Sequence, residues 1–330
     1  MPNKNRAAKT AEIRKEMDQT ASLKKPRVSK EEVVQEEPKK GSRIERAIEM
    51  ATKAHEGQKR KSGDNYIVHP LAVMQILESW GMDEDTIIAG VLHDTVEDTE
   101  LTLDDIRNEF GETVAFLVDG VTKINKARKG MRDIDTYLPQ TRSNLLRLLV
   151  AIGSDIRVLI IKLADRLHNL RTLGALPPEK QKKIAKETLE VFAPLADRLG
   201  MGRLRVEMAD IAFSYVDPER YQYLKNLIET RNRSAEKSLV KIKEQVSEAL
   251  KREKIEFKID GRIKSVYSLH KKMAKYDQNI DEIYDLTALR VIVNDITDCY
   301  LVLGVIHSLY TPMSGRIKDY IAVPKQNGYQ

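Results

Sequence analysis

The sequence from Asp83 to Asp98 reads DEDTIIAGVLHDTVED. Acidic residues open this stretch, and carboxylates at the start of a helix are stabilised by the positive end of the helix dipole. The apolar residues that follow repeat at helical spacing and form one face: Ile87, Ile88, Val91 and Leu92. We therefore expect a helix over residues 83–98 with one buried face, inside a helical domain.

The end of this predicted helix is rich in groups that bind metals or move protons. Four of them occupy six positions: His93, Asp94, Glu97 and Asp98. Residues three and four positions apart share a helical face, so these side chains can converge. A solvated acidic helix end would have the same composition. The apolar opposite face favours burial instead, and buried carboxylates are costly unless a cation or hydrogen bonds compensate them. The pattern favours a divalent metal.

Two other segments offer matching groups. His69 ends the loop QKRKSGDNYIVHP at residues 58–70, and Asp165 lies in the predicted helix IIKLADRLHNLRTL at residues 160–173. The polar face of that helix carries three residues: Asp165, Asn169 and Thr172. Taken alone, His69 is an ordinary hydrogen-bonded histidine and Asp165 an ion-pair partner of Arg166 or Arg171. The combination of the three segments favours a site.

The periodicity along the chain predicts a mainly α-helical protein. Helical spacing recurs near residues 43–54, 71–80, 103–110, 113–123, 141–152, 155–173 and 179–199. Residues 218–253 are predicted to form two more helices. Beyond residue 255 the pattern alternates, which predicts strands at 257–261, 286–293 and 316–323. The expected parts are a disordered tail at 1–42, a helical domain at 43–200, linker helices at 201–254 and an incomplete α+β domain at 255–330.

Composition narrows the function classes. The net charge is +6, of which the tail at residues 1–42 carries +4, so a general nucleic-acid binder is disfavoured. The single cysteine, Cys299, excludes a disulfide within the chain and a zinc site built from several cysteines. No apolar stretch approaches the roughly 20 residues of a membrane-spanning helix. The N-terminal residues lack the apolar segment of a secretory signal. We expect a cytoplasmic protein.

The three site segments resemble a known family. A histidine, a His-Asp dipeptide and a distal aspartate are similar to the pattern of HD-domain metallophosphohydrolases. The surrounding sequences QKRKSGDNYIVHP, AGVLHDTVEDT and IKLADRLHNLRTL resemble, more narrowly, the hydrolase domain of the Rel/SpoT family of bifunctional alarmone enzymes. The resemblance implies an all-helical domain that removes the 3′-pyrophosphate from ppGpp and pppGpp.

The resemblance also implies roles for individual residues. A manganese ion would be held by four ligands: His69, His93, Asp94 and Asp165. Glu97 and Asp98 would orient and deprotonate the attacking water. The guanine base would be held by Arg60, Lys61 and Ser62, and the ribose by Asn169 and Thr172. Imidazole and carboxylate ligands alone do not select manganese over iron, cobalt or zinc.

The end of the chain resembles the synthetase domain of the same family, which has a nucleotidyltransferase-like α+β fold. GRIKSVYSLHKKM and IYDLTALRVIV carry the positions implied for ATP and its magnesium ion: Arg262, Lys264, Ser268, Lys272 and, for magnesium, Asp285. RIKDYIAVPKQNGYQ carries those implied for GDP or GTP: Lys318, Lys325, Asn327 and Tyr329.

We expect the hydrolase to be complete and the synthetase truncated, since the family continues beyond Gln330 to a second magnesium ligand and to regulatory domains. Hydrolysis without efficient synthesis is then expected of this fragment, and both activities of a longer parent in the stringent response. Ribosome or tRNA contacts would require the missing domains. Three alternatives remain: an HD phosphohydrolase for another nucleotide, a non-catalytic nucleotide-binding module, and a nucleic-acid-binding protein.

Overall fold

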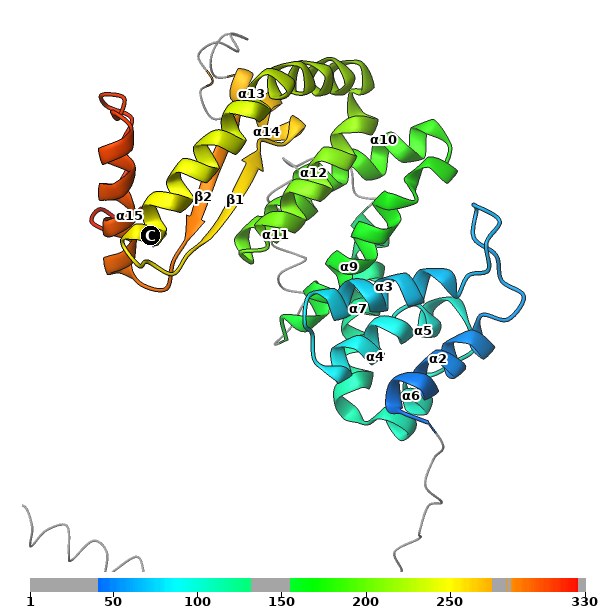
Figure 1. Ribbon diagram of the computed structural model, residues 1–330. Helices are drawn as coiled ribbons and strands as arrows, with labels where there is room; N and C mark the ends of the chain where they lie inside the picture. The colour runs from blue at the N-terminus through cyan, green and yellow to red at the C-terminus, as the bar shows by residue number, and fades with distance from the viewer. Residues whose placement is uncertain (1–40, 132–154, 275–282, 284–285, 326–330) are drawn as a thin grey trace, which may run out of the picture. The chain divides into compact units, whose positions relative to one another are not determined.

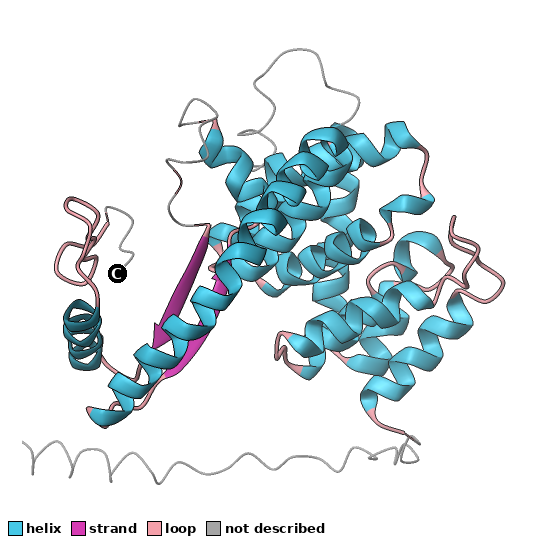
Figure 2. Cartoon of the chain, turned by 45° about the horizontal axis from the view of Figure 1, so that its top comes forward, coloured by secondary structure: helices cyan, strands magenta, loops and turns pink. Residues whose placement is uncertain are grey.

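The computed structural model describes residues 41–131, 155–274, 283 and 286–325, and the residues from Ser42 onward form one unit. The predicted tail and the predicted helix at 141–152 lie outside the described residues. Helices dominate the described chain, with one small sheet near its C-terminal end, which confirms the predicted mainly α fold class (Figures 1 and 2).

Seven helices precede and surround the predicted site. They are α2 (Arg43–Ala54), α3 (Val68–Ser79), α4 (Glu84–Leu92), α5 (Thr95–Asp98), α6 (Leu103–Phe110), α7 (Glu112–Met131) and α9 (Arg157–Arg171). The starts of α2, α4 and α6 follow from short polar side chains: the Asp83 carboxylate accepts from the Thr86 amide, and Ser42 and Thr102 form capping boxes.

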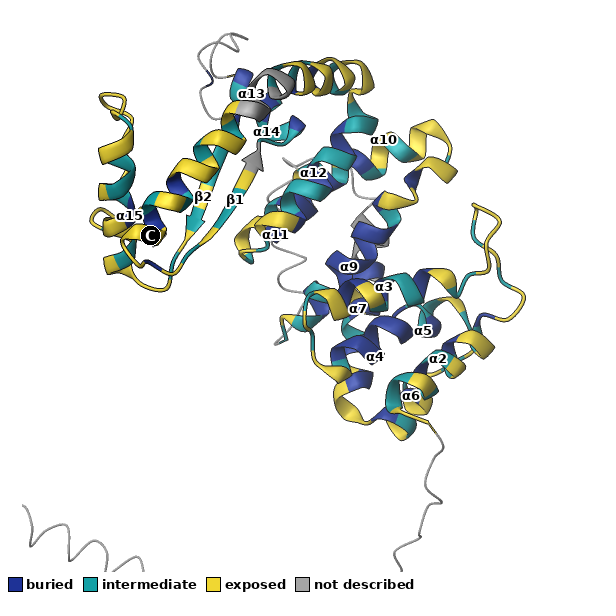
Figure 3. Cartoon of the chain, viewed as in Figure 1, coloured by how far each residue is buried: buried dark blue, intermediate teal, exposed yellow. Residues whose placement is uncertain are grey.

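The helical core is continuous from α2 into α12. After α9 the chain continues through η1 (Leu173–Ala175), α10 (Pro178–Glu187), the π-helical turn η2 (Thr188–Phe192), α11 (Ala193–Arg198), α12 (Gly202–Val216) and α13 (Pro218–Arg252). Figure 3 shows the buried faces of α4 and α9, and residues 86–92 of α4 are all buried. Leu204, Met208 and Ala212 of α12 belong to the same buried cluster.

Close packing of α3, α4 and α9 creates the surroundings of the site. A Cβ on Gly90 of α4 would collide with the end of the Leu77 side chain of α3, so the absence of a side chain at Gly90 allows this approach without a shift of Leu77. Because α3 begins just before His69 and α4 ends just before His93, their packing brings the two histidines together.

Some predicted boundaries were wrong. The helix expected over 83–98 is interrupted at His93 and Asp94, where His93 Nδ1 and Thr95 Oγ1 donate to the carbonyls of Gly90 and Leu92. Such side-chain hydrogen bonds compete with helix continuation. The helix expected over 179–199 contains the π-helical turn η2, and the two helices expected in 218–253 are the single helix α13.

The C-terminal segment contains an antiparallel pair of strands. β1 (Lys258–Ile263) pairs with β2 (Thr287–Ile292), with Lys258 opposite Ile292 and Ile263 opposite Thr287. Helix α14 (Val266–Met273) lies between them in sequence, and α15 (Ile296–Leu309), which the periodicity missed, follows β2. The Asp295 side chain caps α15.

The strand predicted at 316–323 was wrong. This segment forms turns, in which Asp319 Oδ1 accepts from the amides of Ile321 and Ala322. An aspartate that binds its own following backbone favours a turn over a strand. Within the described part of the chain, no helix has the length and apolar character needed to cross a membrane.

Asp210 of α12 caps the start of α14 from a distance in sequence. Its two carboxylate oxygens accept from the amides of Val266 and Tyr267 at 3.2 and 2.9 Å, and burial raises the pKa of its carboxyl. Removal of this acceptor would leave two partly buried donors without a partner.

We therefore expect Asp210→Ala to lower the free energy of unfolding by about 1–3 kcal/mol, measured by urea denaturation. Asp104→Ala is the matched control, because Asp104 is exposed and pairs only with Arg107 on the same helix. It should cost less than about 1 kcal/mol. Equal losses for the two variants would contradict the capping role.

Candidate metal centre

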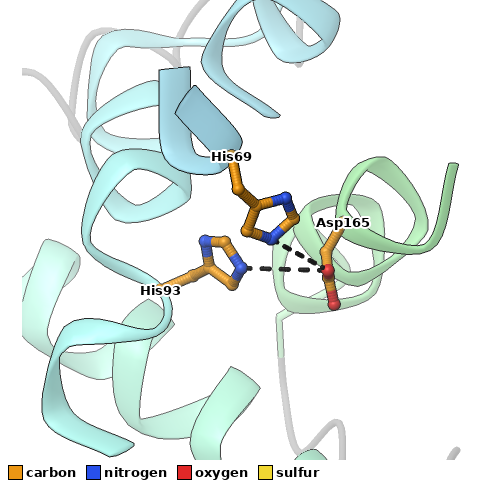
Figure 4. A group of neighbouring side chains, drawn as sticks. All are labelled: His69, His93 and Asp165. Atoms are coloured by element: carbon orange, nitrogen blue, oxygen red, sulfur yellow. Dashed lines mark ion pairs between the residues drawn. The ribbon is translucent and has the colours of Figure 1, made fainter. Parts of the chain in front are cut away.

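Three buried side chains from three helices meet at one point. His69 comes from the first turn of α3, His93 follows the last residue of α4, and Asp165 comes from the middle of α9 (Figure 4). One nitrogen or oxygen atom from each lies within 4.8 Å of the other two. His69 Nε2 is 3.3 Å from Asp165 Oδ1, and His93 Nε2 is 4.0 Å from the same oxygen.

Asp94, the fourth predicted ligand, lies beside this group. Its Oδ1 is 3.1 Å from His93 Nε2, and its Oδ2 is 3.5 Å from His69 Nε2. The interruption of the helix after α4 gives Asp94 its position next to both imidazoles. All four predicted ligands are therefore near one another.

The protonation of His93 suits a metal ligand. Its Nδ1 lies 2.7 Å from the carbonyl oxygen of Gly90, so Nδ1 donates a proton to that oxygen. In the neutral ring Nε2 then carries the lone pair; this nitrogen is buried and makes no hydrogen bond among the described residues, although Asp94 Oδ1 lies 3.1 Å away. A buried nitrogen of this kind, directed toward two carboxylates, fits a divalent cation.

Asp165 is held by two donors on its own helix. Lys162 Nζ donates to Oδ2, and Asn169 Nδ2 donates to Oδ1. The side chain of Lys162 is only 5% exposed, so this ion pair lies in the interior. Burial opposes ionisation of Asp165, but Lys162, His69 and His93 together outweigh it and hold the pKa of the carboxyl well below its usual range.

The other charges of the site are coupled in the same way. Burial again opposes ionisation of Asp94, yet the nearby imidazoles hold the pKa of its carboxyl well below its usual range. Burial disfavours a proton on His93, but Asp94 and Asp165 together outweigh it and raise the pKa of His93 to about 9. A cation at this point competes with that proton. Two imidazoles and two ionised carboxylates, with no thiolate, form a ligand set for a divalent metal such as manganese, iron or zinc.

The two predicted catalytic carboxylates have different neighbours. Tyr66 Oη lies 2.9 Å from Asp94 Oδ2 and 3.1 Å from Asp98 Oδ2, so one phenol links a ligand carboxylate to a predicted base. Burial and both carboxylates raise the pKa of Tyr66. Glu97 instead accepts from Asn125 Nδ2 of α7 at 2.9 Å. Both carboxylates thus lie on the rim of the group, Asp98 held by the turn before α3 and Glu97 by α7.

Arg60, predicted to hold the guanine base, contacts α9. Its Nη2 donates to Asn169 Oδ1 at 2.9 Å, and its Nη1 lies 3.1 Å from His168 Nδ1. His168 Nδ1 is in turn 2.7 Å from His69 Nδ1. Burial, followed by the neighbouring His69 and Arg60, lowers the pKa of His168 to about 4, so its ring is neutral.

The other predicted nucleotide contacts lie in exposed positions around this group. Ser62 Oγ donates to Asp64 Oδ2 at 2.8 Å, and Thr172 Oγ1 donates to the carbonyl oxygen of His168 at 3.0 Å. The ammonium group of Lys180 on α10 lowers the pKa of Lys61. Two neighbouring ammonium groups favour a bound anion.

The residues predicted to bind ATP and GTP are only partly described. Asp285, Asn327 and Tyr329 lie outside the described residues, as does the side chain of Arg262 in β1. Lys264 precedes α14, and its amide donates to the Leu286 carbonyl at 2.8 Å; Ser268 and Lys272 lie on α14. Lys318 is exposed, and Lys325 Nζ lies 4.4 Å from the ring centroid of Tyr320.

Sequence reasoning missed four residues of the centre: Tyr66, Asn125, Lys162 and His168. Tyr66, Lys162 and His168 each stand within three residues of a predicted ligand, and this proximity was an available signal. Asn125 had no such signal, because it belongs to a helix that joins the site only through packing.

Comparisons with known proteins agree with this geometry. Residues 47–202 match the HD domain family, and residues 261–330 match the family described as a region found in RelA / SpoT proteins. A "GTP pyrophosphokinase" of Streptomyces coelicolor is 47% identical over 87% of this chain and 33% of its own length. A "guanosine-3′,5′-bis(diphosphate) 3′-pyrophosphohydrolase" of Spiroplasma citri is 44% identical over 87% of this chain and 38% of its own length.

A third relative carries both activities in its name. The "bifunctional (p)ppGpp synthase/hydrolase SpoT" of Escherichia coli is 43% identical over 87% of this chain and 40% of its own length. The chain therefore spans 33% to 40% of the length of these three curated relatives. With an HD domain followed by a RelA / SpoT region, and with relatives of these names over most of its residues, the chain belongs to the Rel/SpoT family.

Proposed function

We propose that this chain hydrolyses the 3′-pyrophosphate of ppGpp and pppGpp in a metal-dependent reaction. Water attacks the phosphorus bonded to the 3′ oxygen, the bond between that phosphorus and O3′ breaks, and O3′ takes up a proton. The products are GDP or GTP and pyrophosphate. The observation that carries this proposal is the buried group of His69, His93 and Asp165 inside the segment that matches the HD family.

In this proposal the metal is Mn²⁺, and its ligands are His69, His93, Asp94 and Asp165. When bound, such an ion supplies an acidified water and withdraws charge from the phosphoryl group. The protein prepares the ligands: Gly90 fixes the tautomer of His93, and Lys162 fixes the orientation of the Asp165 carboxylate.

Asp98 and Glu97 are proposed to manage the proton of the attacking water. Asp98 is suited to accept it, because Tyr66 holds the Asp98 carboxylate beside Asp94. Glu97 is suited to orient the water, since Asn125 fixes its carboxylate on the α7 side. Two carboxylates held from separate parts of the fold, the turn before α3 and helix α7, can keep a constant distance during the reaction.

The nucleotide is proposed to lie against the loop before α3 and the C-terminal end of α9. Arg60, Lys61 and Ser62 would hold the guanine base, and Asn169 and Thr172 the ribose. The positive charge of Lys61 and Lys180 supports binding of a phosphate-rich ligand. Guanidinium, amide and hydroxyl groups match the stacking and hydrogen bonding that a purine nucleoside requires.

For the segment that matches the RelA / SpoT region, we propose binding of ATP and of GDP or GTP for pyrophosphate transfer. Arg262, Lys264, Ser268 and Lys272 would contact ATP, and Asp285 would bind Mg²⁺. The guanine nucleotide would be contacted by Lys318, Lys325, Asn327 and Tyr329. The proposed parts of the chain are a tail (1–42), a hydrolase domain (43–200), linker helices (201–254) and a synthetase segment (255–330). Contacts with a ribosome or tRNA would lie outside this chain.

The hydrolase proposal is tested by ppGpp turnover. The purified chain is stripped of metal with a chelator, Mn²⁺ is restored, and GDP and pyrophosphate are measured. We expect both products in equal amounts only with metal. Turnover of dGTP or of a cyclic dinucleotide instead of ppGpp would assign another HD phosphohydrolase, and no turnover of any of them with metal bound would indicate a binding module.

The roles of the two rim carboxylates predict a separation of turnover from metal binding. Glu97→Gln with Asp98→Asn should lower kcat for ppGpp by about 10²- to 10⁴-fold, because a general base is lost. Metal affinity should remain unchanged, as neither residue is a proposed ligand. Glu100→Gln, two residues farther along the chain and exposed, is the control and should keep full turnover. An unchanged kcat in the double variant would remove both residues from catalysis.

Metal affinity should depend on pH through His93. Because the pKa of His93 is raised to about 9, most of the metal-free protein carries that proton at neutral pH and must release it on binding. The apparent affinity for Mn²⁺ should therefore rise by about tenfold for each pH unit between roughly pH 7 and 8.5 and level off above the pKa. Chelator competition, corrected for the chelator's own protonation, measures this. An affinity independent of pH would contradict the assignment of His93.

A further inference from the structure

His168 occupies a position next to the centre that no part of the proposed reaction uses. It follows Asp165 by one turn of α9 and is 8% exposed. Its ring lies against the ring of His69, with centroids 4.9 Å apart, and their Nδ1 atoms are separated by 2.7 Å. That distance is a hydrogen bond, and so one of the two Nδ1 atoms carries the proton and the other accepts it.

The contact with Arg60 shows whether His69 Nδ1 or His168 Nδ1 carries the proton. Its guanidinium Nη1 lies 3.1 Å from His168 Nδ1, and an arginine side chain can only donate. His168 Nδ1 must therefore hold a lone pair, which leaves its own ring proton on Nε2. The proton between the two rings then belongs to Nδ1 of His69, and the single lone pair of His168 Nδ1 accepts from both donors. The second contact of Arg60, to Asn169, keeps the guanidinium in this orientation.

The consequence for His69 is a defined tautomer. With Nδ1 protonated, the lone pair is on Nε2, which lies 3.3 Å from Asp165 Oδ1 and 3.5 Å from Asp94 Oδ2. This is the nitrogen that faces the other ligands. A free imidazole carries its proton mainly on Nε2, so without an acceptor at Nδ1 the ring would direct a proton toward the cation site.

We propose that His168 is a positioning residue, which holds His69 in the tautomer and ring orientation that present Nε2 to a divalent cation. His93 has the equivalent partner in a backbone carbonyl, that of Gly90. His69 has no such carbonyl at Nδ1 among its described hydrogen bonds and uses a neutral side chain instead. Outer partners of this kind typically contribute about 10- to 100-fold to metal affinity.

This inference deepens the proposed metal-dependent function, and its test does not use ppGpp. Two variants of His168 distinguish the role of its hydrogen-bond acceptor from the role of its aromatic ring. His168→Phe keeps an aromatic ring but has no acceptor, whereas His168→Asn places Oδ1 where Nδ1 stands. Mn²⁺ affinity is measured for both and for the unmodified chain from the electron paramagnetic resonance signal of free Mn²⁺, after circular dichroism has compared their folding.

We expect His168→Phe to bind Mn²⁺ about 10- to 100-fold more weakly, and His168→Asn to bind it nearly as the unmodified chain does. Unchanged affinity in His168→Phe would overturn the proposal. An equal loss in both variants would also overturn it, since the ring would then act by packing alone. If the unmodified chain binds Mn²⁺ but leaves ppGpp intact, the proposed hydrolysis fails while this inference stands.

A second measurement decides the matter even if His168→Phe does not fold or no metal binds. The chain has six histidines, and their tautomers can be read from long-range ¹H–¹⁵N correlations in protein with ¹⁵N-labelled histidine and added chelator. We expect the proton of His69 on Nδ1 and that of His168 on Nε2. A His69 ring protonated only on Nε2 would refute the proposal.

Discussion

The organising constraint of this structure is the burial of negative charge between packed helices. Asp165 has a side chain only 6% exposed, and the Asp94 side chain beside it is 13% exposed. Ionised carboxylates in such surroundings are tolerated only with cations or hydrogen-bond donors around them. The packing of α3, α4 and α9 places those partners, namely Lys162, His69 and His93, within contact distance.

Part of the compensation in the metal-free protein comes from a proton that a metal can displace, and this makes the site chemically useful. Lys162 and the protonated His93 supply two positive charges for two carboxylates. A divalent ion would replace the proton of His93 and bind the same nitrogen. The positive charge of Lys162, close to the proposed ligands, also weakens the binding of a metal cation. A metal held this way can still withdraw charge from a substrate.

Much of the centre could be predicted from the sequence, since the residues that bind metal stand in short motifs with helical spacing. His69, His93, Asp94 and Asp165 were identified in this way, and the structure brings them close to one another. The interruption after α4 could not be predicted, because it depends on hydrogen bonds from side chains to particular carbonyls. The spacing of apolar residues predicts which face of a helix is buried. It does not predict which backbone carbonyl accepts a hydrogen bond from a given side chain.

The same reason explains why the partners of the ligands escaped prediction. His168 stands on the buried side of α9, where its spacing indicates only a core residue, and its role depends on Arg60, 108 positions earlier in the chain. A hydrogen bond across such a separation is a property of the folded chain. Through His168, Arg60 in the loop proposed to hold the guanine base is linked to His69, a proposed metal ligand. A nucleotide that engages Arg60 would therefore alter the donors around His168, so that substrate and metal would not bind independently.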